Sequence, residues 1–283
     1  MTRPTFLVTG ATDGIGKQTA LNLARSGARV LVHGRNAVKA ERAAAELRAA
    51  SGNPELEAVW GDFTSLAQVR ALAEAVRAKT DRLDGLVHNA GVFMPSRLLT
   101  ADGLEATFQI NYLASFLLTH LLLGLLEEAP AGRIVIVSSV AHQGGYLDFD
   151  NLQGEKNFDD YSAYASSKLA DLLFAVELAE RLQGTRVTVN ALHPGTVGTK
   201  LLKTGFGMDG MDVERGARNS TYLALSPEVA GVTGQYFMDC MPTACSPFVD
   251  DAALRRRLWE RSEKLAGLTA VDASGARTKV GLP

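Results

Sequence analysis

An apolar strand joined to a helix by a glycine-rich turn opens the chain, and this unit restricts the fold more than any other. Residues 5–9 are Thr-Phe-Leu-Val-Thr, a short buried strand, and Gly10-Ala11-Thr12-Asp13-Gly14-Ile15-Gly16 follows. Apolar residues then recur at helical spacing from Ala20 to Ala24. Glycines allow a close approach to the backbone, and free N–H groups at a helix start attract an anion. The unit therefore predicts a pyrophosphate site, and an ordinary tight turn is the alternative.

Short strands alternate with helical segments along most of the chain. Ile134-Val135-Ile136-Val137 is an unbroken β-branched run, expected at the centre of a sheet that is buried on both faces. The alternation predicts an α/β fold with a doubly wound, mostly parallel sheet of about seven strands and helices on both faces. Strands are predicted at 5–9, 29–33, 56–60, 86–88, 134–137, 185–192 and, at an edge, 235–238; helices are predicted at 37–50, 66–80, 104–126, 162–182 and 250–265.

The length of 283 residues suits a single domain over 1–283, and no interdomain linker is visible. We expect a cofactor-binding half at about 1–140, a catalytic and substrate half at about 141–250, and a C-terminal helix and tail at about 250–283. We expect an irregular excursion with one helical turn at 140–160, a mobile apolar and glycine-rich flap over the substrate at 200–216, and a loose tail at 267–283.

A tyrosine and a lysine lie four residues apart, at Tyr164 and Lys168, and so share one face of a helix. A free phenol has a pKa of about 10, which a nearby ammonium lowers. Tyr164 would then exchange protons at neutral pH, poised by Lys168. Tyr161 does not match this pattern, because its fourth neighbour is Ala165 rather than a lysine. The alternative is an ordinary surface pair.

The end of the second predicted strand bears on the choice of cofactor. An acidic residue at this position would bind the free ribose 2′-hydroxyl of NAD. Gly34-Arg35-Asn36 stands there instead, and a guanidinium suits a 2′-phosphate. The sequence therefore predicts NADP(H), with NAD as the alternative cofactor. The alternative is that Arg35 is only a solvated turn residue and does not contact the cofactor.

The order of several motifs resembles the short-chain dehydrogenase/reductase family. Ser138-Ser139-Val140-Ala141-His142, the long insertion before Tyr164, and His193-Pro194-Gly195 are similar to the branch around the retinol dehydrogenases and WW-domain-containing oxidoreductase, although no WW domain is present. The resemblance covers about residues 5–240 and implies a Rossmann-type fold. The motifs are Thr9-Gly10-x-x-x-Gly14-x-Gly16, Asn89-Ala90-Gly91, Asn111, Ser139, Tyr164-x-x-x-Lys168 and Pro194-Gly195.

This resemblance also implies residue roles. Asn111, Ser139, Tyr164 and Lys168 match the family's catalytic tetrad. Asp62 matches an acid that meets the adenine ring, and Asn89 a residue that steadies the sheet. The implied cofactor contacts are Gly10, Thr12, Asp13, Gly14, Ile15, Gly16, Arg35, Asp62, Phe63, Asn89, Ala90, Gly91, Tyr164, Lys168, Pro194, Gly195, Val197 and Thr199.

One position departs from the family's pattern. Many NADP-type members carry a basic residue just before the second motif glycine, where this chain has Asp13. Arg35 would then select NADP largely unaided, with Lys17 as a candidate helper.

The implied reaction is reversible hydride transfer between NADP(H) and a carbonyl or alcohol substrate. Ser139 would hold the substrate oxygen, Tyr164 would exchange its proton, and Asn111 would keep a water beside Lys168. Ser138, His142 and His193 are expected to have structural roles. The alternative is a non-catalytic NADP(H)-sensing Rossmann protein that binds a partner protein. A nucleotide-dependent methyltransferase is disfavoured by the tetrad and the pyrophosphate-type loop.

An apolar set of residues falls on loops expected to surround the substrate. Such a lining favours a lipophilic small molecule over a charged metabolite, and packing beneath the flap is the alternative role for some of these side chains. The set is Val92, Phe93, Met94, Tyr146, Leu201, Leu202, Phe206, Met208 and Met211.

Composition argues against several other classes of protein. A net charge of -2 gives no basic footprint for nucleic acid. The longest apolar run, 113–126, is shorter than the roughly 20 residues that span a bilayer, so no membrane span and no signal peptide are expected. No spacing suggests a metal site. Cys240 and Cys245 are predicted to be free thiols, and the sequence thus predicts a cytoplasmic protein.

Two helices, 104–126 and 162–182, look apolar nearly all round. Assembly as a homodimer or homotetramer would cover their outer faces. Burial beneath the chain's own C-terminal segment is the alternative.

Overall fold

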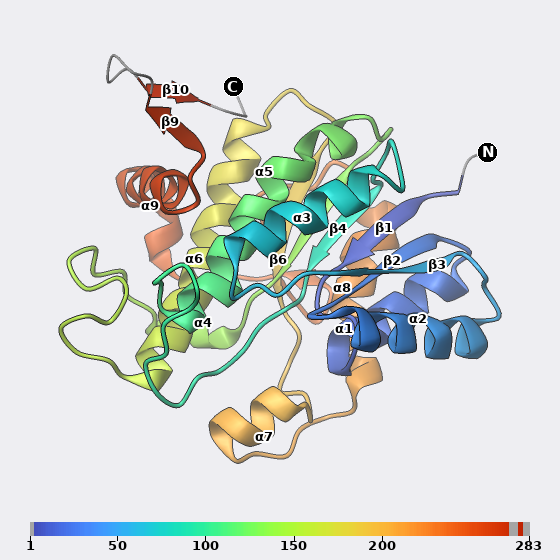
Figure 1. The fold of residues 1–283 in the computed structure, drawn as a ribbon, viewed down its shortest axis with the longest axis horizontal. Coiled ribbons are helices and arrows are strands. Elements are labelled where there is room, and N and C mark those ends of the chain that lie inside the picture. The colour runs from blue at the N-terminus through green and yellow to red at the C-terminus, as the bar shows by residue number, and fades with distance from the viewer. Residues whose placement is uncertain (1–2, 272–276, 280–283) are drawn as a thin grey trace.

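An eight-stranded sheet runs through the middle of the described residues, which are 3–271 and 277–279 of this computed structural model (Figure 1). Its order is β3-β2-β1-β4-β5-β6-β7-β8, and every neighbouring pair is parallel except the antiparallel pair β7–β8. The strands are β1 (Thr5–Val8), β2 (Arg29–Gly34), β3 (Leu56–Trp60), β4 (Gly85–His88), β5 (Arg133–Val137), β6 (Thr188–His193), β7 (Tyr236–Met238) and β8 (Met241–Pro242).

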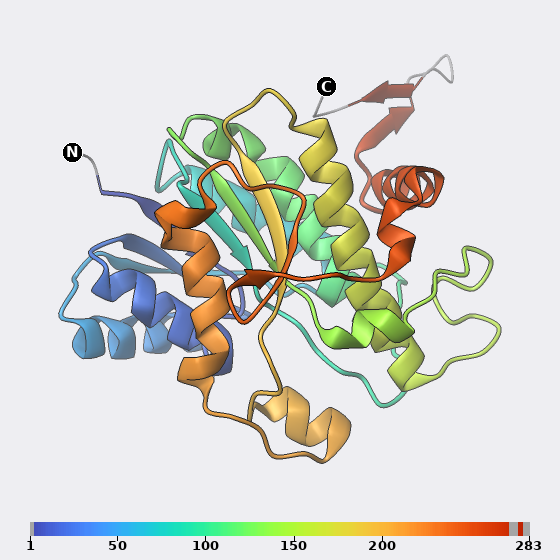
Figure 2. The same ribbon diagram turned by 180° about the vertical axis from the view of Figure 1, so that it is seen from behind.

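Helices cover both faces of the sheet, which confirms the predicted doubly wound fold. Figure 1 faces the side of α3 and α5, and Figure 2 faces the side of α1 and α8. Each face has its own apolar core because the parallel strands are buried on both sides. One core contains α1 (Gly14–Arg25), α2 (Ala37–Ser51) and α8 (Val213–Leu225); the other contains α3 (Leu66–Arg77), α5 (Ala114–Glu127) and α6 (Asp160–Arg181).

The predicted helix at 104–126 is continuous but changes its winding. It consists of α4 (Ala106–Phe108), a π-helical turn η1 (Gln109–Leu113) and α5. The whole stretch of 22 residues is long and apolar enough to cross a membrane, and 78% of its apolar window is buried inside the molecule. Buried core helices meet the same criterion. The absence of a membrane span therefore stays a prediction.

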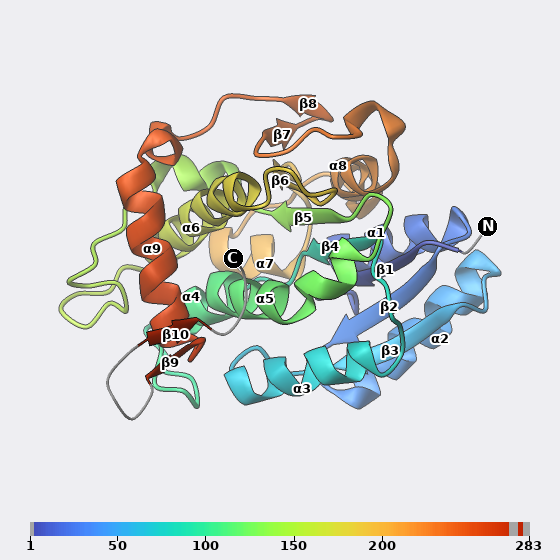
Figure 3. The same cartoon turned by 90° about the horizontal axis from the view of Figure 1, so that it is seen from above.

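The outer faces of α5 and α6 are covered by α9 (Ala252–Leu265), which lies beside α6 in Figure 3. The Trp259 ring centroid is 5.0 Å from that of Phe116 on α5 and 6.0 Å from that of Phe174 on α6. The chain's own C-terminal helix thus buries apolar surface on both helices, as the second alternative for these faces proposed. Assembly as a homodimer or homotetramer stays a prediction.

The secondary structure differs from the prediction, or adds to it, at four places. β7 is not the edge strand, because Asp239 and Cys240 form a tight turn with φ of 51° and 63° that adds β8 outside it. α8 went unpredicted because its buried face consists largely of small and polar residues such as Gly216 and Asn219. The short helix α7 (Lys200–Phe206) lies within the predicted flap, and the described part of the tail contains the antiparallel pair β9 (Thr269–Val271) and β10 (Arg277–Lys279).

Candidate active site

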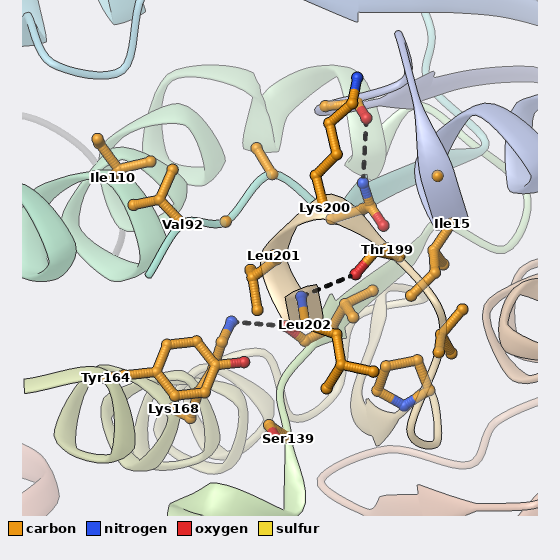
Figure 4. A pocket seen from close by; sticks show the side chains of 18 of the residues that line it. Ile15, Val92, Ile110, Ser139, Tyr164, Lys168, Thr199, Lys200, Leu201 and Leu202 are labelled. Carbon is orange, nitrogen blue, oxygen red and sulfur yellow. Dashed lines mark hydrogen bonds between the residues drawn. The ribbon is translucent and has the colours of Figure 1, made fainter. Parts of the chain in front are cut away.

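A cavity of about 740 Å³ opens at the carboxyl ends of the central strands (Figure 4). It lies where the strand order reverses between β1 and β4, the usual ligand site of open α/β sheets. Gly16 and Asn111 lie behind its wall rather than on it. The other predicted site residues line it: Gly10, Thr12, Asp13, Gly14, Ile15, Arg35, Asp62, Phe63, Asn89, Ala90, Gly91, Ser139, Tyr164, Lys168, Pro194, Gly195, Val197 and Thr199.

The glycine-rich turn packs directly against the end of β4. Gly10 has a φ of +63°, and a Cβ on it would lie 2.8 Å from the Cα of Ala90. A Cβ on Gly16 would lie 2.2 Å from the Nδ2 of Asn89, which itself donates hydrogen bonds to the carbonyl oxygens of Thr9 and Gly10 at 3.0 and 3.3 Å. Only glycine fits at both positions. Asn89 therefore joins the turn to the sheet, and the start of α1 faces the cavity.

Charged groups beside this turn are already engaged with one another. Asp13 caps α1 by accepting a hydrogen bond from the Gly14 N–H at 2.9 Å, and Lys200 of α7 pairs with its carboxylate. The hydrogen bond from Lys200 holds the pKa of Asp13 below its usual value. Lys17 pairs with Glu46 on α2 and does not line the cavity. Arg35 lines the cavity and is exposed.

His33 is a site residue that the sequence reasoning missed. It lies buried at the end of β2, accepts a hydrogen bond from the Gly10 N–H at Nδ1 (3.1 Å), and has Nε2 3.0 Å from the Gly61 carbonyl oxygen. Its ring stacks on Phe63 at 4.8 Å. Burial lowers the pKa of His33 to about 4, so the ring is neutral at pH 7 and can accept at Nδ1. The sequence did offer a signal for this role, because His33 is the one polar residue at the end of an otherwise apolar predicted strand.

Tyr164 and Lys168 project from α6 into the cavity beside Ser139 (Figure 4). They are 6% and 5% exposed, so the surface-pair alternative is wrong. The Lys168 ammonium lies 5.9 Å from the Tyr164 ring centroid and donates to the Val137 carbonyl oxygen at 3.0 Å. Phe93 packs against the tyrosine ring at a centroid distance of 5.6 Å. The phenol and the ammonium are thus held together away from bulk water.

Ser139 stands at the end of β5 as the predicted strand-end hydroxyl. Its Oγ accepts from the Ala141 N–H at 3.2 Å and caps the short helix η2 (Val140–Gly144). Because the oxygen acts as acceptor in this contact, its own O–H proton remains for donation toward the cavity.

Asn111 occupies the π-helical turn, a type of distortion often found at functional sites. Its Oδ1 accepts from the Val92 N–H at 2.7 Å, and its Nδ2 donates to the Val92 carbonyl oxygen at 3.0 Å and the Ser167 Oγ at 2.9 Å. A Cβ on Gly91 would lie 3.5 Å from the Asn111 Oδ1 and 3.8 Å from the Lys168 Nζ. Asn111 therefore ties the loop after β4 to α6, behind the lysine.

The neighbouring polar residues contact backbone groups. Ser138 Oγ donates to the Lys168 carbonyl oxygen at 2.8 Å. His142 is fully buried, with Nδ1 2.6 Å from the Ser139 carbonyl oxygen, and accepts from the Ser246 N–H at Nε2 (3.1 Å). His193 accepts from the Val140 N–H at 3.2 Å. These contacts agree with the structural roles expected for the three residues.

The apolar end of the cavity matches the predicted lining only in part. Phe93 lies behind Tyr164, Met211 packs on Gly195, and Tyr146 is 67% exposed beside Phe248. The side chain of Phe206 lies outside the described part of the structure. Val92, Met94, Leu201, Leu202 and Met208 do line the cavity, and Ile110, Val137, Val140 and Ala141 join them without having been predicted.

No cluster of three or more His, Cys, Asp or Glu side chains is placed to hold a metal ion among the described residues.

Comparison with known proteins identifies the chain. The model of the short chain dehydrogenase family matches residues 4–208. This protein belongs to the short-chain dehydrogenase family. It is an oxidoreductase of the retinol dehydrogenase-like branch, as the motif order predicted.

This short-chain dehydrogenase is similar to known proteins over nearly its whole length. It is 42% identical to human retinol dehydrogenase 14, over 93% of this chain and 86% of that protein. A crystal structure of an uncharacterized protein from Mycobacterium paratuberculosis is similar with a TM-score of 0.80 and 31% identity, over 94% of each chain. The NADP active-site complex of Pseudomonas aeruginosa RhlG is similar with a TM-score of 0.69 and 27% identity, over 83% of this chain and 93% of that one.

The cavity of this short-chain dehydrogenase fits a nicotinamide dinucleotide. Its volume lies within the range of known ligand sites. At the end of the cavity beside the glycine-rich turn, Gly10 and Gly14 have no Cβ atoms, which leaves room for a pyrophosphate close to the backbone. The first N–H groups of α1 face the same space.

Proposed function

We propose that this protein interconverts a carbonyl and an alcohol on a lipophilic small molecule, with NADP(H) as its cofactor and Tyr164 as acid and base. The observation that carries the proposal is the buried pair of Tyr164 and Lys168, which faces the cavity beside Ser139. A phenol beside a buried ammonium can exchange a proton with a substrate oxygen while the positive charge stabilises the phenolate that forms.

Each of the four predicted catalytic residues has one task. Tyr164 gives its proton to the substrate oxygen during reduction and takes it back during oxidation. Ser139 donates a hydrogen bond to that oxygen and so stabilises the negative charge that develops there. Lys168 favours the phenolate, and Asn111 holds the loop behind the lysine, where a water would link it to solvent. NADP(H), when bound, supplies or accepts the hydride.

The preference for NADP(H) rests on the rim of the cavity. Arg35 follows β2 and offers a guanidinium where an adenosine 2′-phosphate would lie, and β2 ends without an acidic residue. Asp13 would repel a phosphate, but its pairing with Lys200 offsets that charge. The bound NADP of the RhlG complex, a protein of similar fold, also supports this preference.

The substrate class follows from the side chains opposite Tyr164. Leu201 and Leu202 enter the cavity from α7, and Val92 and Ile110 approach from the other wall (Figure 4). A pocket of this kind gains free energy from burying an apolar substrate, at about 25 cal/mol per Å². The name of the human relative, retinol dehydrogenase 14, agrees with a lipophilic alcohol or aldehyde.

The test is an assay of NADPH and NADH oxidation by the purified protein with a panel of aromatic, aliphatic and retinoid carbonyls. We expect turnover with NADPH and an apolar carbonyl, and weaker turnover with NADH. Tight NADPH binding without turnover of any carbonyl would favour the non-catalytic sensor instead. A cytoplasmic location stays a prediction, tested by fractionation of the source cells.

A further inference from the structure

A buried carboxylate lies directly behind the lysine of the proposed site. Asp171 follows Lys168 by one turn of α6, and its Oδ2 accepts a hydrogen bond from the Lys168 Nζ at 2.9 Å. The two side chains are 6% and 2% exposed. The other carboxylate oxygen, Oδ1, is buried and has no hydrogen-bond partner among the described residues. Burying a carboxylate in this way costs free energy, which only its ion pair with Lys168 can offset.

The lysine in turn has two contacts that fix its position. Its ammonium is held between Asp171 on its own helix and the Val137 carbonyl oxygen at the end of β5. These contacts place the positive charge 5.9 Å from the Tyr164 ring centroid. Without the carboxylate, one of the two anchors would be lost and the charge beside the phenol would be uncompensated.

We propose that Asp171 is a positioning residue of the reaction, which fixes the Lys168 ammonium and offsets part of the positive charge that reaches Tyr164. This inference rests on the proposed function, in which Tyr164 exchanges the substrate proton. The carboxylate touches neither the cavity nor a reacting atom. It acts through Lys168 alone.

Among the described residues, titratable groups face Asp171 from α6 and from η1. Lys168 and Tyr164 lie on the same helix, and Tyr112 faces it from η1 with its hydroxyl 2.7 Å from the Ser262 Oγ of α9. Burial raises the pKa of Asp171 to about 6, against the attraction of Lys168. Burial alone would lower the pKa of Lys168, but the charges of Asp171 and Tyr164 outweigh it and raise that pKa. The ammonium is therefore charged at neutral pH.

Removing the carboxylate charge should shift the pH at which Tyr164 and Lys168 release a proton in one direction only. A negative charge near a phenol and an ammonium makes each of them hold its proton more tightly. Because the two groups titrate together, the loss of that charge lowers the pH at which the pair releases its first proton. We expect a downward shift of about one pH unit, since the charge lies close to the lysine and is little screened.

The test compares Asp171→Asn, which keeps the side-chain shape, with Glu177→Gln as a matched control. Glu177 is also buried on α6, but pairs with Arg181 and Arg255 away from the cavity. The midpoint of the pH profile of kcat/KM for alcohol oxidation should fall by about one unit in Asp171→Asn and stay unchanged in Glu177→Gln. Loss of stability alone would occur in both variants and would not move the profile.

A second readout does not depend on turnover. Tyrosinate absorbance is followed against pH in the cofactor-free protein, and Tyr164→Phe assigns the signal of Tyr164. The first ionisation should shift downward in Asp171→Asn. If that variant does not fold, Asp171→Ser takes its place with the same expected shift. An unshifted titration in a folded variant would overturn the positioning role. Wild-type protein that turns over no carbonyl would overturn the proposed function instead.

Discussion

The Nζ of Lys168 lies 5.9 Å from the ring centroid of Tyr164, and both side chains are buried on the same helix. This arrangement matters because a positive charge in a poorly solvated environment acts more strongly on a neighbouring phenol than one in water. The strand-end Ser139 lies on the same wall of the cavity. Four predictions test the site and the fold that holds it.

Replacement of Tyr164 by Phe should lower kcat by about 10²–10⁴, because it removes only the proton donor. NADPH binding, measured by quenching of protein fluorescence, should change less than about threefold, since the ring and Lys168 remain. Tyr222→Phe is the matched control: Tyr222 lies on α8, does not line the cavity, and should keep wild-type turnover. Comparable activity of both variants would remove Tyr164 from the mechanism.

Replacement of Arg35 by Ala should raise the KM for NADPH about 10- to 100-fold, the value of one charged hydrogen bond to a phosphate. The KM for NADH should change much less, since NADH lacks the 2′-phosphate. Arg42→Ala serves as control, because Arg42 is exposed on the neighbouring helix α2 and pairs with Glu46. Equal effects on both cofactors would mean that Arg35 does not select between them.

Thermal stability should fall as the pH drops through the range from about 6.5 to 4. Burial lowers the pKa of His33 to about 4 and that of His88 to about 3, whereas an unfolded imidazole has a pKa of about 6.5. The unfolded chain therefore binds more protons in this range, so the stabilisation is complete above pH 6.5 and is lost toward pH 4. Calorimetry should show a Tm at least about 5 °C lower at pH 5 than at pH 7.5.

Carboxylates also contribute to acid unfolding, so this prediction needs a variant that lacks one buried imidazole. His88→Gln should show a smaller difference in Tm between the two pH values than the wild type. An identical difference would mean that this histidine is protonated in the folded protein or exposed.

Replacement of Trp259 by Ala should lower the free energy of unfolding by about 3–5 kcal/mol, as for large aromatic side chains removed from a core. Trp259 is 2% exposed and contacts Phe116 and Phe174. The Arg181 guanidinium lies over its ring, 4.0 Å from the centroid. The measurement is urea unfolding followed by circular dichroism.

Its matched control is Trp60→Ala, since Trp60 is 48% exposed at the end of β3 and should change stability by less than about 1 kcal/mol. Light scattering of the Trp259 variant also probes assembly, because loosening α9 uncovers the apolar faces of α5 and α6. Similar losses of stability in both variants would contradict the role assigned to α9.

Local sequence patterns predicted the elements whose residues are dictated by burial or by close packing. The β-branched run of β5 and the glycines at Gly10 and Gly16 belong to this class, because few other residues fit there. Elements that depend on distant contacts were missed. The buried face of α8 includes Asn219, whose amide donates to the His193 and Phe237 carbonyl oxygens. This face of the helix therefore does not look apolar in the sequence.

The same distinction holds for the site. Tyr164 and Lys168 were visible because their spacing on one helix is local. His33 was not visible, because its partner at Gly10 becomes a neighbour only after folding. Asp171 lies only three residues after Lys168, but its burial, which gives the pair its significance, depends on the packing around α6 and cannot be read from spacing. Phe93 and Tyr146 were assigned to the substrate lining from their place on loops, but loop position does not determine the direction of a side chain.

The pairing of Lys200 with Asp13 joins the glycine-rich turn to the start of α7, since Asp13 caps α1 and Lys200 begins α7. Both partners are well exposed, and such contacts contribute little free energy in water. Salt or a competing anion would therefore separate Lys200 from Asp13 at a small cost in free energy. This ion pair would therefore add little resistance to a movement of α7 relative to the glycine-rich turn.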